Sequence, residues 1–464
     1  MDKVFANPAA AVADVADGSS VAIAGFGVGH SYPNSLVVAL RDQGAKSLKI
    51  VANSLGAGAD YRPQMLVEND QVSKVVVSFS ARPGMVTAEQ GRIAAGDIDL
   101  EMVPQGILVE RLRAAGAGLP AFFSPVTVGT PLAEGKEIRE FDGRQFVLEH
   151  ALPVDVAMIR GHRADRYGNV EFRGSSAHFH VSFAKAAALT IVEVDEIVEP
   201  GVIAPEHVHL PGIFVTRVVQ STIQYPPPGG RSKRRAPDSA RTYLGKPAMT
   251  RSQMARRAAE MLPDDGYVNL GSGLPTLVAG HIRERSIFLH AENGALGYDL
   301  LDDPEQFDPD YFDAAGAFIR VRPGGAVFES VCSFEIARSG RLSAVLLGAY
   351  QVSQGGDLAN WSVPGQVGGG IGGAMDLACS GSQVIVVMEH HGSDGTPKLV
   401  AECSYPVTAP ACVDVIVTDL AVLRRQGDTF CVTEIVEGFS PEEIRSLTPV
   451  TLTFAGTPGV IRLG

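Results

Sequence analysis

A carboxylate that follows an apolar segment is the first feature of this sequence that could do chemistry. Residues 286–290 read as a strand, and the chain then enters Glu292-Asn293-Gly294, residue types that suit a sharp turn. Just upstream, a Gly271-Ser272-Gly273 turn follows a short strand, and Pro275 opens a helix. Free backbone amides in such a turn attract negative charge. Glu292 is therefore a candidate nucleophile or base; the alternative is an ordinary surface glutamate.

A second glycine cluster occupies residues 368–373 and reads Gly-Gly-Gly-Ile-Gly-Gly. Five glycines in six positions would weaken the interior of a helix or strand. We therefore expect the backbone here to approach another group closely. A flexible surface loop is the alternative on composition alone.

Polar and glycine-rich turns also follow three apolar segments in the first half of the chain. Gly25-Phe26-Gly27 follows residues 21–24, Asn53-Ser54 follows residues 48–52, and Pro104-Gln105-Gly106 follows residues 98–103. Side-chain amides can donate hydrogen bonds to an acyl oxygen or a carboxylate without adding charge. Each of these turns alone is more typical of structure than of a site. Together they favour a site between the two halves.

The elements that must position these residues form an α/β pattern. Strands alternate with helices, for example at residues 21–24 and 33–40, which predicts mainly parallel sheets. The pattern also repeats: residues 157–161 match 345–348 at an offset of 187, whereas Gly25 and Gly27 match Gly271 and Gly273 at an offset of 246. We therefore predict two homologous open α/β domains, at residues 1–222 and 250–464, joined by a linker at residues 223–249.

Composition narrows the class of protein. The net charge of −13 disfavours nucleic acid and anionic membranes as partners, and the basic cluster at residues 231–235 reads as solvated linker. No apolar run suits a membrane helix, and the first residues resemble neither a signal peptide nor a transit peptide, so we expect a cytoplasmic protein. The five cysteines contain no C-x-x-C pair, which predicts buried free thiols and no metal site.

Residues 268–275, Val-Asn-Leu-Gly-Ser-Gly-Leu-Pro, followed by Glu292-Asn293-Gly294, resemble the second half of family I CoA-transferases. Residues 372–377, Gly-Gly-Ala-Met-Asp-Leu, resemble another motif of that family. The succinyl-CoA:3-oxoacid type, with its two subunit-like halves fused, is the most similar. The resemblance implies that Glu292 is the catalytic nucleophile and that Gly373 contributes to the oxyanion hole. Together with the polar and glycine-rich turns described above, it leads us to a candidate substrate-binding set of Asn53, Ser54, Gln105, His30, Gly25, Phe26, Gly27, Asn293, Gly294 and Ala374.

The reaction implied by the resemblance is ping-pong transfer of coenzyme A through a glutamyl-CoA thioester, between an acyl-CoA and a 3-oxoacid or dicarboxylic acid. An ordinary glutamate is already ionised at neutral pH, so we expect no general base. Coenzyme A enters as a co-substrate, and we expect no bound cofactor and no metal. We expect a homodimer or homotetramer.

Three departures from the family pattern concern the acyl side. His30 stands where the family has a glycine, Ser54 replaces a second asparagine, and Ala291 replaces a serine. These changes leave the identity of the acids open, and His30 is either a substrate contact or a plain loop residue. Two other functions remain: a thioester or ring-opening hydrolase in which Glu292 activates water, and an acyl-CoA-binding protein without catalysis.

Overall fold

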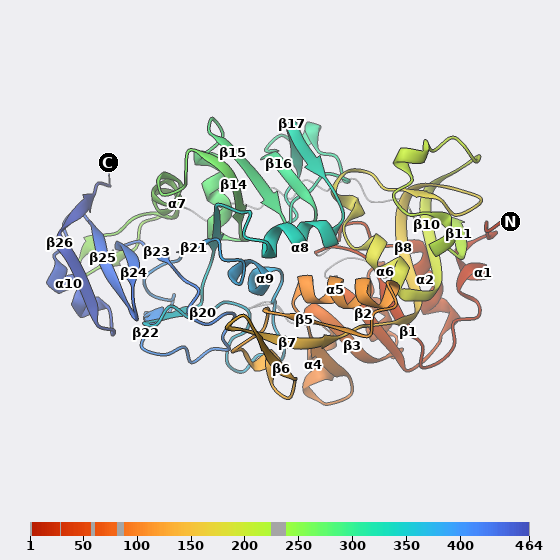
Figure 1. Ribbon diagram of the computed structural model, residues 1–464, viewed down its shortest axis with the longest axis horizontal. Helices are drawn as coiled ribbons and strands as arrows, with labels where there is room; N and C mark the ends of the chain where they lie inside the picture. Colours follow the sequence, from red (N-terminus) through yellow and green to blue (C-terminus); the bar gives the residue numbers. More distant parts are fainter. Residues whose placement is uncertain (1, 28, 57–60, 81–87, 224–237, 464) are drawn as a thin grey trace.

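The computed structural model describes residues 2–27, 29–56, 61–80, 88–223 and 238–463 (Figure 1). Two large sheets lie at opposite ends of an elongated molecule, one from each half of the chain (Figure 1). Among the described residues, no helix has the length and apolar character that crossing a membrane would require. Residues 224–237, most of the predicted linker, lie outside the described residues.

The first sheet has eight strands, and all but β9 (Val170–Glu171) run parallel to their neighbours. In spatial order the parallel strands are β11 (Arg217–Gln220), β10 (Ala187–Val198), β8 (Val154–Asp165), β1 (Ser20–Ile23), β2 (Leu48–Ser54), β3 (Val72–Phe79) and β4 (Asp99–Met102). The apolar segments at residues 21–24, 48–52 and 98–103 form β1, β2 and β4.

The second sheet has ten strands with a parallel centre; the pairs β16–β17, β15–β16, β23–β24 and β24–β25 beside it are antiparallel, and the edge pair β25–β26 is parallel. In spatial order they are β17 (Ile319–Val327), β16 (Ala295–Leu300), β15 (Ser286–Ala291), β14 (Asp265–Leu270), β18 (Ala344–Leu347), β21 (Gln383–Val387), β23 (Val415–Val417), β24 (Ala421–Gln426), β25 (Thr429–Val436) and β26 (Leu452–Ile461). The order β23-β21-β18-β14-β15 repeats the order β11-β10-β8-β1-β2 of the first sheet. The two halves are thus mainly parallel α/β domains of the same central topology, as predicted.

Helices form three layers around the two sheets. Their bounds are α1 (Pro8–Val12), α2 (Asn34–Gln43), α3 (Gln64–Glu68), α4 (Ala88–Ala94), α5 (Gln105–Gly116), α6 (His180–Ala186), α7 (Arg251–Glu260), α8 (Ser330–Arg338), α9 (Ala374–Ala378) and α10 (Pro441–Leu447). Helices α1, α2 and α3 pack on the outer face of the first sheet, and α7 packs on the outer face of the second. The central core joins α5 and α6 of the first half to α8 and α9 of the second (Figure 1).

Capping boxes are present where two of the helices begin. Thr250 and Gln253 form a capping box at the start of α7, and Ser440 and Glu443 form one at α10. The helix predicted after Pro275 is instead the 3-10 helix η5 (Leu274–His281). Its N-cap, Gly273, has no side chain to accept a hydrogen bond from the first amides, and its eight residues make it long for a 3-10 helix.

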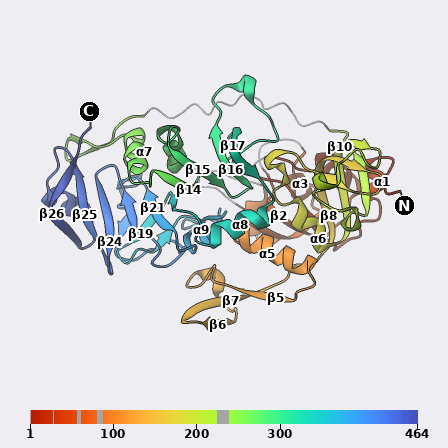
Figure 2. The ribbon, with the colours of Figure 1, turned by 45° about the horizontal axis from the view of Figure 1, so that its top comes forward.

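Smaller sheets accompany the two large sheets. Strands β5 (Ala121–Ser124), β7 (Arg144–His150) and β6 (Ile138–Phe141) form an antiparallel sheet that stands away from the body in Figure 2. Strands β20 (Leu358–Ala359), β19 (Gln351–Ser353) and β22 (Leu399–Val400) form another. Strands β12 (Thr242–Tyr243) and β13 (Lys246–Pro247) form a hairpin within the predicted linker, where the Tyr243 hydroxyl donates to Asp419 at 3.0 Å. The described end of the predicted linker is therefore folded onto the second half, and the domain boundaries themselves stay a prediction.

Candidate active site

Glu292 lies in the turn between β15 and β16, at the carboxyl end of a central parallel strand. The Gly294 amide donates to the Ala291 carbonyl at 2.9 Å, and the Gly294 carbonyl accepts a hydrogen bond from Phe328 at 2.9 Å. Gly294 has φ of 107°, a value that favours glycine, and a Cβ there would overlap the Phe328 carbonyl oxygen. Gly294 therefore fixes the direction in which the half-buried Glu292 side chain leaves the strand.

A buried network of polar side chains lies next to this turn and bonds to its backbone. The Asn269 amide group lies 3.1 Å from His290 Nδ1, and His290 Nε2 lies 3.0 Å from the Ser333 hydroxyl. The Ser333 hydroxyl donates to the Ala291 carbonyl at 3.2 Å. Burial lowers the pKa of His290 to about 4, so this imidazole is neutral at physiological pH. Ser333 thus links the His290 ring to the backbone that leads into Glu292.

Gly373 lies directly against the Glu292 side chain. A Cβ built on Gly373 would stand 3.4 Å from both Cγ and Cδ of Glu292 and 3.2 Å from the Phe334 ring. Gly373 is the N-cap of α9, and Ala374 is the first residue of that helix. The second glycine cluster is therefore a packed loop that reaches the candidate nucleophile, as expected from its composition.

The first half of the chain holds this glycine loop in place. The backbone N–H of Gln105 donates to the Gly372 carbonyl at 3.0 Å, and the backbone N–H of Ile371 donates to the Ser78 carbonyl at 2.9 Å. One residue further, the Gly106 amide donates to the Asp376 carboxylate at 3.0 Å. Glu292 and Gly373 therefore lie where the two halves meet, as predicted.

Asn53 and Gln105 meet at the same junction. Gln105 Nε2 donates to Asn53 Oδ1 at 2.8 Å, and both side chains are buried. Asn53 Nδ2 and Gln105 Oε1 are buried without a hydrogen-bond partner among the described residues. Because such groups are costly to bury unpaired, they suit a polar group of a substrate.

Ser54 and the glycine turn of the first half bond to each other. The Ser54 hydroxyl donates to the Gly27 carbonyl at 2.7 Å and lies 3.0 Å from the Tyr32 hydroxyl. A Cβ at Gly25 would overlap the Tyr32 ring. Ser54 and Gly25 therefore shape this loop, and substrate contact by either of them stays a prediction.

His30 connects the same loop to the second half. Its ring stacks on Phe312 with 4.1 Å between centroids, and the Phe26 ring lies 6.1 Å from Phe312. Phe312 also accepts a hydrogen bond at its carbonyl from Asn293 at 2.8 Å. Burial, and next the charge of Arg62, lower the pKa of His30 to about 4, so its ring is neutral. The structure thus gives His30 a packing contact, and its role toward substrate stays a prediction.

The protein environment makes Glu292 a weaker acid than an ordinary glutamate. Desolvation raises its pKa to about 7, the charges of Asp313 and Asp376 add to this effect, and hydrogen bonds from its own backbone amide and from Asn269 oppose it. The expectation of a fully ionised glutamate at neutral pH is therefore wrong for the free enzyme. The sequence could not show this because the desolvation and the two aspartates come from distant segments.

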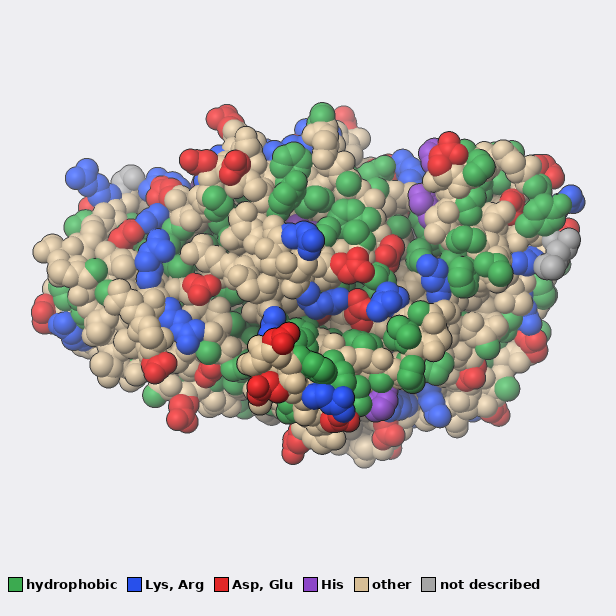
Figure 3. All heavy atoms as spheres, viewed as in Figure 1, with side chains coloured by type: hydrophobic (Ala, Val, Ile, Leu, Met, Phe, Trp, Pro, Cys, Tyr) green, Lys and Arg blue, Asp and Glu red, His purple; other side chains and the backbone are tan. Residues whose placement is uncertain are grey.

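A chain of ion pairs ties the two halves together beside the site. Arg338 of α8 pairs with Asp376 at 3.1 Å and with Glu110 of α5 at 2.6 Å, and Glu110 also pairs with Arg113 at 2.6 Å. Charged side chains of both signs gather in this region in the middle of the face shown in Figure 3. Burial raises the pKa of Asp376, although Arg338 and the Gly106 amide act in the opposite direction.

Replacing Arg338 should destabilise the protein because it would leave the buried Asp376 without its cation and would remove one of the two arginines that pair with Glu110. We expect Arg338→Met to lower the free energy of unfolding by about 3 kcal/mol. The control is Arg283→Met, which removes an exposed partner of Asp302 and should change stability by less than about 0.5 kcal/mol. Urea unfolding of both variants tests this; equal stability of the two would contradict it.

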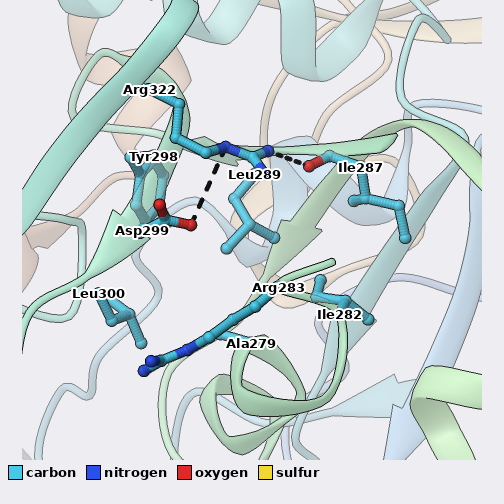
Figure 4. A pocket seen from close by; sticks show the side chains of 9 residues that line it. All are labelled: Ala279, Ile282, Arg283, Ile287, Leu289, Tyr298, Asp299, Leu300 and Arg322. Carbon is cyan, nitrogen blue, oxygen red and sulfur yellow. Dashed lines mark hydrogen bonds and ion pairs between the residues drawn. The ribbon is translucent and has the colours of Figure 1, made fainter. Parts of the chain in front are cut away.

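A small cavity lies in the second half of the chain (Figure 4). Its volume is about 10 Å³, which is at the lower limit for one water molecule. It is lined by Ala279, Ile282, Arg283, Ile287, Leu289, Tyr298, Asp299, Leu300 and Arg322. Arg322 donates to the Ile287 carbonyl across it. We interpret the cavity as a packing defect, because it is far too small for an acyl-CoA.

In the described part of the chain, no three or more His, Cys, Asp or Glu side chains are grouped so that they could hold a metal ion. All five cysteines are free; Cys431 is buried, whereas the other four are half-buried. The prediction of buried thiols is thus correct in full only for Cys431.

A model of the family described as coenzyme A transferase matches residues 5–221 and 251–446. The chain belongs to the coenzyme A transferase family. The two matched segments correspond to the two halves of the fold and leave out the residues between them. Members of this family transfer coenzyme A between an acyl-CoA and a carboxylic acid, and this chain is an enzyme of that kind.

Relatives show how much of the CoA-transferase chain is shared. The mouse succinyl-CoA:3-ketoacid coenzyme A transferase 2B, mitochondrial, is 39% identical, with 98% of this chain and 90% of that protein covered. One of the subunits of a 3-oxoadipate CoA-transferase from Pseudomonas putida is 43% identical over 47% of this chain and 94% of its own length. The crystal structure of the acyl-CoA transferase YdiF from Escherichia coli O157:H7 has a TM-score of 0.82 at 21% identity and covers 99% of this chain and 95% of its own, which shows the same fold.

Several residues around Glu292 in this CoA-transferase were not predicted from the sequence to belong to the site. Asn269 belongs to the motif at residues 268–275. Its position at the end of a strand, before a glycine turn, could have marked it as a candidate site residue. His290 could also have been recognised as a candidate site residue, because it is a polar residue in an apolar strand close to Glu292. Asp313 and Asp376 act on Glu292 through space, and only the folded chain shows that they are near it.

Proposed function

We propose that Glu292 carries coenzyme A as a covalent thioester during transfer. The observation that supports this most directly is the contact between the Glu292 carboxyl group and Gly373, 3.4 Å from a Cβ built on that glycine. Glycine leaves room there for a reacting carbonyl, and backbone amides at the start of α9 can stabilise the negative charge that develops on its oxygen.

The steps balance without a metal or a redox partner. A carboxylate oxygen of Glu292 attacks the acyl-CoA thioester carbon, the C–S bond breaks, and CoA thiolate leaves behind an acyl-glutamyl anhydride. The thiolate then attacks the glutamyl carbonyl carbon and displaces the acyl group as its free carboxylate. The acceptor carboxylate reverses both steps and leaves as the new acyl-CoA. One negative charge is present throughout, so no proton transfer is needed.

The raised pKa of Glu292 fits this role. A poorly solvated carboxylate has less bound water to lose when it attacks. The glutamyl thioester carries no charge, so it does not bear the desolvation cost of the ionised carboxylate at the same position. A pKa of about 7 would also suit a general base that activates water. Hydrolysis by the same glutamate is therefore the second candidate function.

The names of the relatives suggest the acids. We propose succinyl-CoA as a donor and a 3-oxoacid as an acceptor, because the mouse relative is named for these compounds. The P. putida relative, named for 3-oxoadipate, makes a dicarboxylic 3-oxoacid a further acceptor to test. A cytoplasmic location and a homodimeric or homotetrameric assembly stay predictions; the mouse relative is named as mitochondrial.

A CoA exchange assay separates the candidate functions. Purified enzyme is incubated with succinyl-CoA carrying labelled CoA, with and without acetoacetate or 3-oxoadipate. A transferase forms the labelled acceptor thioester and little free CoA, whereas a hydrolase releases free CoA without any acceptor. No turnover in either arm, with acyl-CoA still bound, would indicate a binding protein and contradict our proposal.

The pH dependence of transfer should follow the ionisation of Glu292. The ionised carboxylate is the reactive form and its pKa is raised to about 7, so kcat/KM for the acyl-CoA should be constant above about pH 8 and fall about tenfold per unit below about pH 6.5. An ordinary glutamate would keep its full rate down to about pH 5. Initial rates from pH 5 to 9, with circular dichroism to confirm folding at each pH, test this. A flat profile down to pH 5 would show that Glu292 is not perturbed.

A further inference from the structure

Arg62 is a buried cation to which the described part of the protein supplies no negative charge. The residue is only 6% exposed, and no Asp or Glu among the described residues forms an ion pair with it. Its Nε is buried without a hydrogen-bond partner among the same residues. Because buried charges are costly unless they are paired and hydrogen-bonded, this guanidinium calls for an anion from elsewhere.

Neutral neighbours hold the Arg62 side chain in place. Its Nη1 donates to Asn34 Oδ1 at 3.0 Å, and its Cζ lies 5.5 Å from the centre of the Tyr32 ring. A Cβ built on Gly29 would stand 2.7 Å from Arg62 Nη2, so this position leaves no room for a side chain. These contacts fix where the guanidinium lies, but none of them neutralises it.

The position of Arg62 connects it to the acyl side of the active site. Gly29 directly precedes His30, which stacks on Phe312, and the Phe312 carbonyl binds Asn293 next to Glu292. On the other side, Tyr32 bonds to Ser54, which follows the buried Asn53. Arg62 therefore lies behind the loop in which this chain departs most from the family pattern.

We propose that Arg62 binds the distal carboxylate of a dicarboxylic acyl group and thereby makes this enzyme prefer a dicarboxylic thioester over the unsubstituted monocarboxylic thioester of the same length. The inference rests on the proposed CoA transfer through Glu292. With Nη1 engaged by Asn34, the Nε and Nη2 edge presents two parallel donors, an arrangement that matches the two oxygens of a carboxylate. The buried Asn34 Nδ2, also without a partner among the described residues, offers a further donor beside it.

The alternative is a purely structural arginine that packs Tyr32 between two glycine-rich loops. Both readings predict damage when Arg62 is removed, so loss of activity alone does not separate them. A structural arginine would affect all acyl groups alike, whereas a carboxylate site affects only those that carry a second carboxylate. The informative quantity is therefore the ratio of two kcat/KM values measured on the same protein.

The test uses acyl-CoA pairs that match in carbon number: succinyl-CoA against butyryl-CoA, glutaryl-CoA against pentanoyl-CoA, and adipyl-CoA against hexanoyl-CoA. Each donor is assayed with the full-length enzyme and a fixed acceptor. The wild-type protein should prefer the dicarboxylic member of at least one pair by about 100-fold. Arg62→Met should reduce that ratio by about 10- to 100-fold, mainly through KM, and Arg62→Lys should restore part of it.

Asn34→Asp supplies a second test that does not depend on removing Arg62. It keeps the size of the side chain and places a carboxylate beside Nη1, so the protein itself neutralises the guanidinium. We expect this variant to lose the preference for dicarboxylic donors while its unfolding temperature is maintained. The control is Arg41→Met on the same helix, which removes a solvent-exposed pair with Asp42 and should leave the ratio unchanged.

The outcomes are distinct. A wild-type enzyme without preference for dicarboxylic donors, or a ratio unchanged in both folded variants, would overturn the role of Arg62 while leaving CoA transfer intact. Absence of transfer with every donor would instead refute the proposed function. A lower ratio in Arg62→Met and in Asn34→Asp, with control values in Arg41→Met, is the result expected.

Discussion

Glu292→Gln should transfer no measurable coenzyme A and yet unfold at a higher temperature than the wild-type protein at pH 8. The loss of the nucleophile should reduce exchange by at least about 10⁴-fold. The gain in stability follows from desolvation, because the fold raises the pKa of this carboxyl from 4.5 to about 7. Ionised Glu292 therefore costs the native state roughly 3 kcal/mol, which an uncharged amide avoids.

The sign of this stability effect changes with pH in a defined way. A carboxyl with a raised folded-state pKa binds its proton more tightly in the native than in the unfolded protein, so its contribution to stability is fully favourable only below about pH 4.5. That contribution is lost as the pH rises to about 7. The difference between Glu292→Gln and wild type should thus be largest above pH 7 and vanish near pH 4.5.

Thermal unfolding monitored by circular dichroism at pH 5, 6, 7 and 8 measures this difference. Glu335→Gln, which changes an exposed glutamate on α8, is the matched control and should leave both activity and unfolding temperature unchanged. A Glu292→Gln protein that is less stable than wild type at pH 8 would show that the carboxylate is not held at an energetic cost.

Gly294→Ala should reduce kcat/KM by at least about 100-fold, and it should destabilise the protein as well. The φ of 107° is unfavourable for alanine, and the new Cβ would overlap the Phe328 carbonyl oxygen. The turn can accept the methyl group only if it moves away from β17, and Glu292 would move with it. Strain and overlap together should cost about 2–4 kcal/mol of stability, and misplacement of the reacting group about 100-fold in rate.

Gly427→Ala separates strain from misplacement. Gly427 has φ of 62° in the turn between β24 and β25, and a Cβ there would meet open space. This variant should lose about 1 kcal/mol of stability with kcat/KM unchanged. Steady-state kinetics and urea unfolding of both variants provide the comparison. Wild-type kinetics in Gly294→Ala would mean that the turn does not position the nucleophile.

The sequence was sufficient for most of the frame that carries the site. Apolar runs followed by glycine-rich or polar turns indicated β1, β2, β4 and β15, and the internal offsets predicted two homologous halves, which share a central strand order. Thr250 and Ser440 cap the helices that follow them, and such side-chain capping is a local interaction. The local signal after Pro275 predicted a helix start but not that the segment would be a 3-10 helix.

The features of the site that the sequence could not predict depend on contacts between distant segments. The pKa of Glu292 is set by burial in the fold and by Asp313 and Asp376, which different loops bring near it. That no described Asp or Glu pairs with Arg62 is visible only once its neighbours in space are known. Residue identity and spacing could therefore nominate a nucleophile, but not its ionisation or the charge of the acid it serves.

Mass spectrometry of the Glu292 peptide during turnover tests the covalent proposal most directly. The enzyme is mixed with succinyl-CoA in the absence of acceptor, reduced with borohydride, digested and analysed, with Glu292→Gln as the blank. The glutamyl-CoA thioester is reducible whereas a carboxylate is not, so we predict an alcohol in place of the Glu292 carboxyl in the wild-type peptide only. An unmodified Glu292 peptide from enzyme that is turning over, or the modification on another residue, would contradict the account.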